Sequence, residues 1–167
     1  LLTISLKTYA IIPVKSFSKA KTRLNIPQIK RELLCKEMLK EVLRTLSKCK
    51  SIDNIVIVSK DDAAIKLSKP FGAIQIFDDE LGVNQAVHLA DQHLSDLECN
   101  CSVIFPQDIP MMESSDIDSL LGFLKSKNSV ILVPSRQFNG TNALVRYYAS
   151  SMKTQYDKGS YSHQINA

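Results

Sequence analysis

Residues 9–14, Tyr-Ala-Ile-Ile-Pro-Val, form a short apolar run, and a basic segment from Lys15 to Arg23 follows it directly. The run contains three β-branched residues and does not alternate with polar ones, which is typical of a strand buried on both faces of a sheet. Five further segments predict strands, at 54–59, 73–77, 102–106, 129–134 and 141–147.

Between these runs, apolar residues recur at helical spacing. From 27 to 49, the residues Leu34, Met38, Val42 and Leu46 recur every fourth position, which predicts one apolar face of a helix. Three more helices are expected: one opening at Asp61 and Asp62, one from near Asn84 carrying Ala86, Ala90, Leu94 and Leu97, and one capped by Ser115 or Asp116 carrying Ile117, Leu120, Leu121 and Leu124. Strands that alternate with helices predict a three-layer α/β/α fold with a mostly parallel sheet, in a single domain spanning 1–167.

The composition excludes several other classes of protein. The chain has 167 residues, of which 44% are hydrophobic and 23% charged, so a disordered or fibrous protein is excluded. No run approaches the roughly 18 apolar residues that a membrane-spanning helix needs, and residues 1–7 do not resemble a secretory signal. The four cysteines show no disulfide-type spacing. We therefore expect a cytoplasmic protein without a membrane partner.

The formal charge of +4 is unevenly distributed, since residues 1–50 carry +9 and residues 51–167 carry −5. A basic segment can bind a nucleic acid or a small polyanion such as a nucleotide, and it is also common on solvated helix faces. Single-stranded nucleic-acid sites interleave aromatic and basic side chains, but the segment 15–50 contains a single aromatic residue, Phe17. We therefore expect no nucleic acid partner, and an RNA-binding module remains an alternative that the salt dependence of binding would test.

Polar clusters follow the predicted strands, at the edge of the sheet where ligands bind in open α/β folds. The first contains Lys15, Lys21, Thr22 and Arg23, which suit a polyphosphate. In the second, Gly82 would allow close backbone approach, and Asn84 offers both a donor and an acceptor to a base or ribose. Asn84 could equally cap the helix that begins there.

Three further clusters complete this edge of the sheet. Asp108 follows the fourth strand between Pro106 and Pro110, where a Mg²⁺-binding carboxylate is expected. The segments around Thr141 and around Gly159 and Ser160 are rich in hydroxyl groups and glycine and could hold an anion.

The order of these motifs resembles the 2-phospho-L-lactate guanylyltransferase family of coenzyme F-420 biosynthesis. The motifs are Ile-Ile-Pro-Val-Lys at 11–15, Ala-Lys-Thr-Arg-Leu at 20–24, Gly-Val-Asn at 82–84, Gln-Asp-Ile-Pro at 107–110, Gly-Thr-Asn-Ala-Leu at 140–144 and Gly-Ser-Tyr-Ser-His at 159–163. The resemblance implies a nucleotide-diphospho-sugar transferase (glycosyltransferase-A-like) fold, GTP as donor, Mg²⁺ as cofactor, and 2-phospho-L-lactate or phosphoenolpyruvate as acceptor. We also expect a homodimer.

The resemblance assigns roles to individual residues. Lys15, Arg23 and Asp108 would be catalytic, and Asp108 would bind the metal. Lys15, Lys21, Thr22, Arg23, Gly82 and Asn84 would bind the nucleotide, and Thr141, Gly159 and Ser160 the acceptor. The chain departs from the family where Asp157 and Lys158 precede Gly159, and it is expected to lack the family's C-terminal segment. A nucleotidyltransferase that uses CTP or a sugar phosphate, and a catalytically inactive scaffold, remain alternatives.

Overall fold

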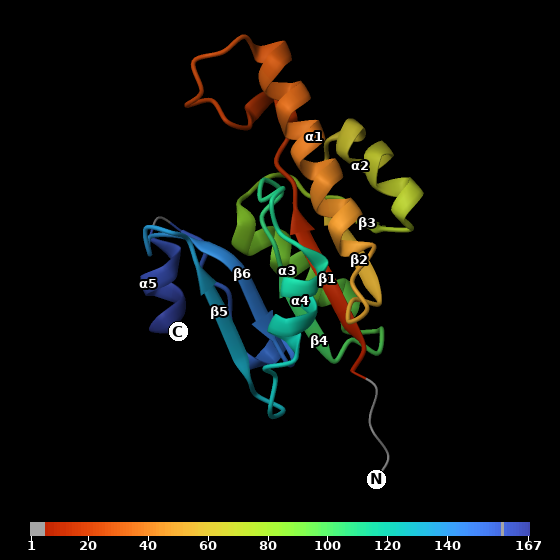
Figure 1. Cartoon of the computed structure of the whole chain (residues 1–167), viewed down its shortest axis with the longest axis vertical. Helices are drawn as coiled ribbons and strands as arrows, with labels where there is room; N and C mark the ends of the chain where they lie inside the picture. Colours follow the sequence, from red (N-terminus) through yellow and green to blue (C-terminus); the bar gives the residue numbers. More distant parts are fainter. Residues whose placement is uncertain (1–5, 158) are drawn as a thin grey trace.

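A six-stranded mixed sheet forms the centre of the protein (Figure 1). The computed structural model describes residues 6–157 and 159–167. The strands are β1 (Thr8–Pro13), β2 (Asn54–Val58), β3 (Ile74–Ile76), β4 (Cys101–Ile104), β5 (Val130–Pro134) and β6 (Thr141–Arg146), in the order β3-β2-β1-β4-β6-β5. Strands β1 to β4 are parallel, and β6 is antiparallel to both β4 and β5. The predicted strands and the mostly parallel sheet are confirmed.

Helices cover both faces of this sheet. They are α1 (Gln28–Leu46), α2 (Asp62–Ser68), α3 (Val83–Leu94), α4 (Ser114–Leu121) and α5 (Ser160–Ile165), with short 3-10 helices η1 (Phe17–Lys19), η2 (Lys69–Phe71) and η3 (Ala149–Ser151). Ala10 and Ile12 of β1 pack in the core that contains α1, α2 and α4, whereas Tyr9 and Ile11 pack in the core that contains α3. Successive residues of a strand point to opposite faces, so β1 is apolar on both sides and the three-layer fold is confirmed.

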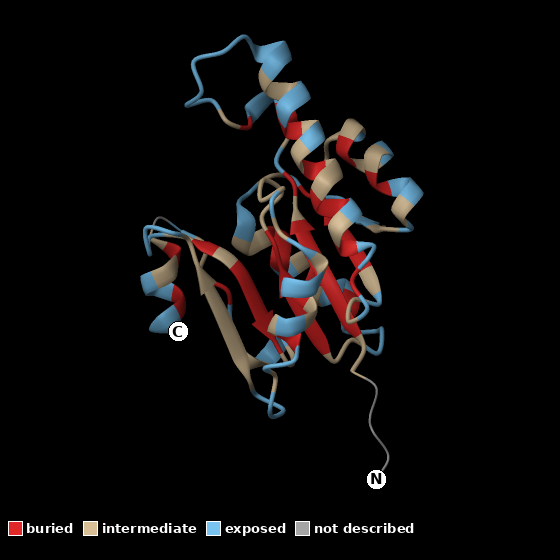
Figure 2. Ribbon diagram, viewed as in Figure 1, coloured by how far each residue is buried: buried red, intermediate tan, exposed pale blue. Residues whose placement is uncertain are grey.

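The apolar face predicted for α1 is partly wrong. The buried residues are Cys35, Leu39, Val42, Leu43 and Leu46, while Leu34 is 39% exposed. A helix turns about 100° per residue, so positions four apart drift about 40° at each step and the predicted stripe winds around the helix. The first turns of α1 also project beyond the sheet, and most of their residues are exposed (Figure 2).

Three smaller expectations about the helices are also corrected. The residue before α4 is Glu113, not Ser115 or Asp116, and its side chain makes no capping hydrogen bond. Gly82 stands before α3, so Asn84 lies inside that helix and is not its cap. Leu97 lies beyond the end of α3 and is 39% exposed. Asp61 does cap α2, because its side chain accepts hydrogen bonds from the Ala63 and Ala64 N–H groups.

The strand order creates a crevice at the carboxyl edge of the sheet. From β1 the chain passes through α1 to β2 on one side, whereas β4 adds to the other side of β1. The segments after β1 and β4 therefore diverge, and ligands in open α/β sheets bind at such a switch point. No helix of the described residues is long and apolar enough to cross a membrane.

Candidate active site

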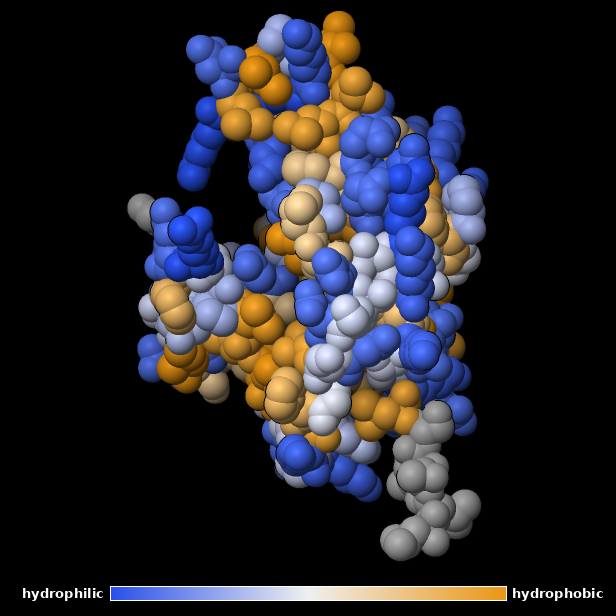
Figure 3. All heavy atoms as spheres, in the orientation of Figure 1, coloured by the Kyte–Doolittle hydropathy of each residue, from blue (hydrophilic) through white to orange (hydrophobic). Residues whose placement is uncertain are grey.

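A cavity of about 1080 Å³ opens at this crevice. It lies between the segment after β1, the end of β3, the segment after β4, and β6, and the surface is hollowed between the overhanging start of α1 and the β5–β6–α5 end of the sheet (Figure 3). The predicted site residues that line it are Lys15, Lys21, Thr22, Arg23, Gly82, Asp108 and Thr141. Residues that are far apart in sequence thus share one cavity.

The basic loop, residues 14–24, is held in place by backbone and side-chain hydrogen bonds at its start. The Val14 N–H donates to the Val58 carbonyl at 2.9 Å, and the Ser59 hydroxyl donates to the Val14 carbonyl at 2.8 Å. The Phe17 N–H donates to Asp61 Oδ2 at 2.9 Å, while Phe17 itself is buried. Contacts of this kind fix a loop before a ligand arrives, which reduces the ordering cost of binding.

Glu80 joins the basic loop to the segment after β3. Its Oε1 accepts the Ser16 N–H at 2.6 Å and also the Ser16 hydroxyl, and its Oε2 accepts Lys19 Nζ at 3.0 Å. Burial alone would raise the pKa of the Glu80 carboxyl, but the hydrogen bonds from Ser16 and Lys19 outweigh it and lower that pKa to about 2. The charged Glu80 side chain therefore links two walls of the cavity, the basic loop and the segment after β3.

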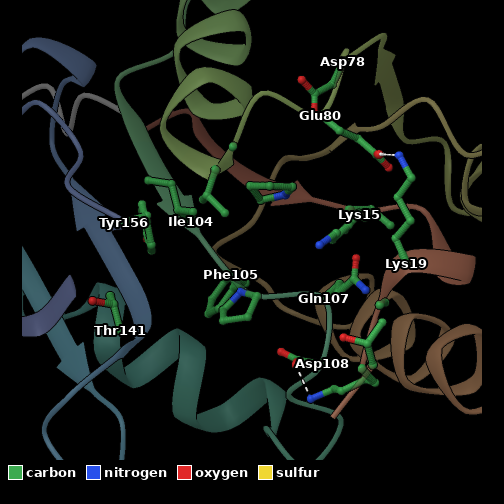
Figure 4. Close-up of a pocket in the computed structure, with 18 of the residues that line it drawn as sticks. Lys15, Lys19, Asp78, Glu80, Ile104, Phe105, Gln107, Asp108, Thr141 and Tyr156 are labelled. Carbon is green, nitrogen blue, oxygen red and sulfur yellow. Dashed lines mark hydrogen bonds and ion pairs between the residues drawn. The ribbon is translucent and has the colours of Figure 1, made fainter. Parts of the chain in front are cut away.

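The cations of the basic loop differ in their partners. Lys21 Nζ lies 2.5 Å from Asp108 Oδ2 and so joins the basic loop to the segment after β4. Among residues 6–157 and 159–167, neither Lys15 nor Arg23 forms an ion pair, and Lys15 points into the cavity (Figure 4). Lys15 and Arg23 thus offer positive charge to an anionic ligand, and Lys21 neutralises Asp108.

Asp108 has the chemistry of a Mg²⁺ ligand. Mg²⁺ is usually held by one or two carboxylates together with substrate phosphates and waters, so a single Asp beside a basic loop fits that ion. Among the residues that the structure describes, no group of three or more His, Cys, Asp or Glu side chains could hold a metal ion by itself. Binding at Asp108 would therefore depend on oxygen ligands brought by the substrate.

Several buried polar atoms in the cavity wall have no partner. Within the described residues, three such side-chain atoms belong to cavity residues: Asp78 Oδ1, Gln107 Oε1 and the Tyr156 hydroxyl. Burial raises the pKa of the Asp78 carboxyl and of the Tyr156 hydroxyl above their ordinary values. Buried polar groups are nearly always hydrogen-bonded in folded proteins, so unpartnered ones around a cavity indicate a polar ligand.

Three predicted site residues do not line the cavity, and their roles stay predictions. Asn84 Oδ1 accepts the Tyr156 N–H at 2.7 Å, so this amide holds the backbone of a cavity residue. Ser160 is buried, and its hydroxyl lies 3.0 Å from the hydroxyl of Thr141, which does line the cavity. Gly159 precedes α5 with φ of 80°, and Lys158 lies outside the described residues.

Sequence reasoning missed several residues that line the cavity, among them Asp78, Glu80 and Gln107. All three lie in the segments after β3 and β4 that the motifs had already marked, but Gly82, Asn84 and Asp108 were selected there instead. A buried carboxylate and an exposed one look identical in a sequence. The one sequence signal that could have included these residues is their position after the carboxyl end of a strand.

A mostly parallel sheet that ends in a basic loop, with a carboxylate across the cavity, is the arrangement expected of a nucleotidyltransferase site. The sequence matches the family described as "Guanylyl transferase CofC like" over residues 8–167, so the chain belongs to this family of guanylyltransferases. It is 32% identical to phosphoenolpyruvate guanylyltransferase from Conexibacter woesei over 155 residues, which cover 90% of this chain and 70% of the relative. It is also 32% identical to 2-phospho-L-lactate guanylyltransferase from Methanobrevibacter ruminantium, covering 83% of this chain and 63% of that protein.

Solved structures support the same fold. The 4-diphosphocytidyl-2C-methyl-D-erythritol synthase of Anaerococcus prevotii matches 97% of this chain and 83% of its own with a TM-score of 0.59 at 12% identity. Such low identity establishes the fold alone. The chain spans between 63% and 80% of the length of the guanylyltransferases it matches.

Proposed function

We propose that this protein transfers GMP from GTP to the phosphate of 2-phospho-L-lactate or phosphoenolpyruvate and releases pyrophosphate. The observation that carries the proposal is that one cavity contains Lys15 and Arg23, which form no ion pair with any described residue, together with the Lys21–Asp108 ion pair and Thr141 on another wall. The relatives supply the two candidate acceptors, because some are named for phosphoenolpyruvate and others for 2-phospho-L-lactate.

The proposed step is attack by an acceptor phosphate oxygen on the α-phosphorus of GTP. The bond from that phosphorus to the bridging oxygen breaks, and pyrophosphate leaves with the electron pair. A phosphate monoester is already largely dianionic at neutral pH, since its second pKa is about 6, so no protein group has to remove a proton from it. Catalysis then depends on orientation and on neutralising charge.

The residues of the cavity suit these two tasks. Arg23 would hold two phosphate oxygens through its planar fork, and Lys15 would act as a point charge. Lys21 neutralises Asp108 in the free protein, so the carboxylate does not repel the approaching triphosphate. Mg²⁺ bound at Asp108 would supply charge neutralisation at the phosphates. Thr141 would contact the acceptor, together with Ser160 behind it.

Release of pyrophosphate tests this proposal directly. The purified protein is incubated with Mg²⁺, each of the four nucleoside triphosphates, and either acceptor. We expect pyrophosphate only with GTP and an acceptor together, and the guanylylated acceptor by mass spectrometry. Turnover with CTP or a sugar phosphate, and none with GTP, would favour the alternative nucleotidyltransferase. Comparing the two acceptors at equal concentration decides between them, and light scattering tests the expected homodimer.

A further inference from the structure

Asp78 is a buried carboxylate in the cavity wall that no step above uses. It follows β3, is 5% exposed, and its Oδ1 has no hydrogen-bond partner among the described residues. A buried acceptor without a donor destabilises a fold by about 1–3 kcal/mol, and more when the group is charged. Because Asp78 lines the cavity, this carboxylate is suited to a ligand that donates hydrogen bonds.

The position of Asp78 separates it from the phosphate-binding part of the cavity. β3 is two strands from β1, and neighbouring strands lie about 4.8 Å apart, so the ends of these strands are about 10 Å from each other. In Figure 4, Asp78 lies at one end of the cavity and Asp108 at the other, with Lys15 between them. A nucleotide with its phosphates at Lys15 and Asp108 would extend its nucleoside toward Asp78.

The surroundings of Asp78 suit a flat, uncharged ring. A phosphate would be repelled by this carboxylate, and the cations Lys19 and Lys60 are already paired with Glu80. Gly82 and Val83, which follow a few residues later in the chain, line the same cavity. Apart from its chain neighbours, Gly82 has no heavy atom within 4 Å of the place where a Cβ would stand, and the apolar Val83 is 40% exposed. The cavity therefore offers open space, an apolar side chain and an acceptor with no partner among the described residues.

Among the common bases, only guanine presents two adjacent N–H donors on its pairing edge, from N1 and from the exocyclic N2. Adenine and cytosine present a donor next to an acceptor, and uracil presents one donor between two acceptors. An ionised carboxylate only accepts, so it pairs fully with guanine and leaves an acceptor opposed to an acceptor with the others. We propose that Asp78 binds the N1–H and N2–H groups of guanine and is the residue that selects GTP. This inference rests on the proposed function.

Binding of base analogues to the unmodified protein tests the contact without any mutation. Calorimetry in the presence of Mg²⁺ would compare GTP with inosine triphosphate, which lacks the N2 amine, and with 1-methyl-GTP, which lacks the N1–H. Hydrogen bonds to charged groups contribute about 1.5–3 kcal/mol, so we expect each analogue to bind about 10- to 100-fold more weakly than GTP. Removing the ribose 2′-hydroxyl should change affinity less than removing the N2 amine.

An Asp78→Asn variant tests the residue itself. An amide can accept from N1–H and donate to the O2 atom that xanthine has in place of the guanine amine. The variant should therefore lose at least about 10-fold in GTP affinity and bind xanthosine triphosphate more tightly than GTP. The matched control is Asp79→Asn, because Asp79 is the exposed neighbouring carboxylate, and it should keep the preference for GTP. Thermal unfolding would establish that both variants are folded.

The outcomes separate this inference from the proposed function. If the unmodified protein binds no GTP, or prefers CTP, both fail. If it binds GTP but binds inosine triphosphate and 1-methyl-GTP equally tightly, Asp78 does not contact the base and only this inference fails. Greater sensitivity to the ribose hydroxyl than to the N2 amine would assign Asp78 to the ribose and also overturn it. Should Asp78→Asn not fold, the analogue series decides alone.

Discussion

Replacing Glu80 with Gln should loosen two walls of the active site at once. Glu80 accepts the Ser16 N–H, the Ser16 hydroxyl and Lys19 Nζ, and these bonds connect the basic loop to the segment after β3. Gln keeps the shape of the side chain and removes its charge. The change in the free energy of unfolding therefore measures the contribution of the Glu80 charge rather than a loss of packing.

The size of the effect follows from the pKa of the Glu80 carboxyl. The fold lowers that pKa from an ordinary value of 4.5 to about 2, and each unit corresponds to about 1.4 kcal/mol, which gives about 3.5 kcal/mol. Hydrogen bonds to a charged group exceed those to a neutral one by about 1 kcal/mol each, and three of them lead to a similar figure. We expect Glu80→Gln to lower the free energy of unfolding by at most about 3.5 kcal/mol at pH 7.

The dependence on pH gives the sharper measurement. Because the pKa of Glu80 is lower in the folded than in the unfolded state, its contribution is fully present above about pH 5 and is lost as the pH falls toward 2. Urea unfolding of both proteins from pH 3 to pH 7 should show a difference that is largest at neutral pH and shrinks in acid. The variant should also bind GTP more weakly, since the loop that carries Lys15 and Arg23 is less fixed.

A surface carboxylate provides the control for this series. Glu41 pairs with Arg44 on the exposed side of α1, and both side chains are nearly half exposed, so Glu41→Gln should change the free energy of unfolding by less than about 0.5 kcal/mol. Equal stability of Glu80→Gln and the unmodified protein from pH 3 to pH 7 would refute the role of Glu80. A constant deficit at every pH would show that the substitution damages packing instead.

The remaining predictions concern catalysis and the core. Asp108→Asn keeps its shape but removes the charge for Mg²⁺, so the turnover number should fall at least about 100-fold, or 2.7 kcal/mol; near-normal pyrophosphate release would contradict this. Lys15→Ala and Arg23→Ala should each weaken GTP binding more than acceptor binding in calorimetry, whereas equal losses would mean that the basic loop does not hold the triphosphate. Arg146 is 1% exposed and bonds both oxygens of Asp91, at 2.9 and 2.6 Å; Arg146→Met should therefore lower the free energy of unfolding in urea by about 3–5 kcal/mol, and a loss below about 1 kcal/mol would show that the pair is dispensable.

Local patterns predicted the layers of this fold well and the helix faces less well. A strand such as β1 is a local feature, because an apolar run flanked by polar residues has one stable place, the centre of a covered sheet. The buried face of α1 is not local, since it depends on where the sheet ends beneath the helix. Leu34 was expected in the core and is exposed for that reason.

The features of the site can likewise be separated into local ones and ones that depend on the fold. The sequence alone was enough to place five residues after strands whose carboxyl ends share one edge of the sheet, and the cavity does contain them: Lys15, Lys21, Thr22, Arg23 and Asp108. The groups that these residues contact could be identified only from the fold, since a position in the chain does not indicate which strand lies beside it.

The burial of each polar side chain and the groups that it contacts follow from the three-dimensional fold and could not be predicted from the chain. The sequence did not indicate that Asn84 accepts a hydrogen bond from the Tyr156 N–H, or that Glu80 holds the basic loop through Ser16. Asp78 and Asp79 are adjacent and chemically identical, yet Asp78 is buried in the cavity wall and Asp79 is exposed. The physical reason is that burial and hydrogen bonding arise from segments distant in the chain, and these set the charge, pKa and ligand chemistry of a carboxylate.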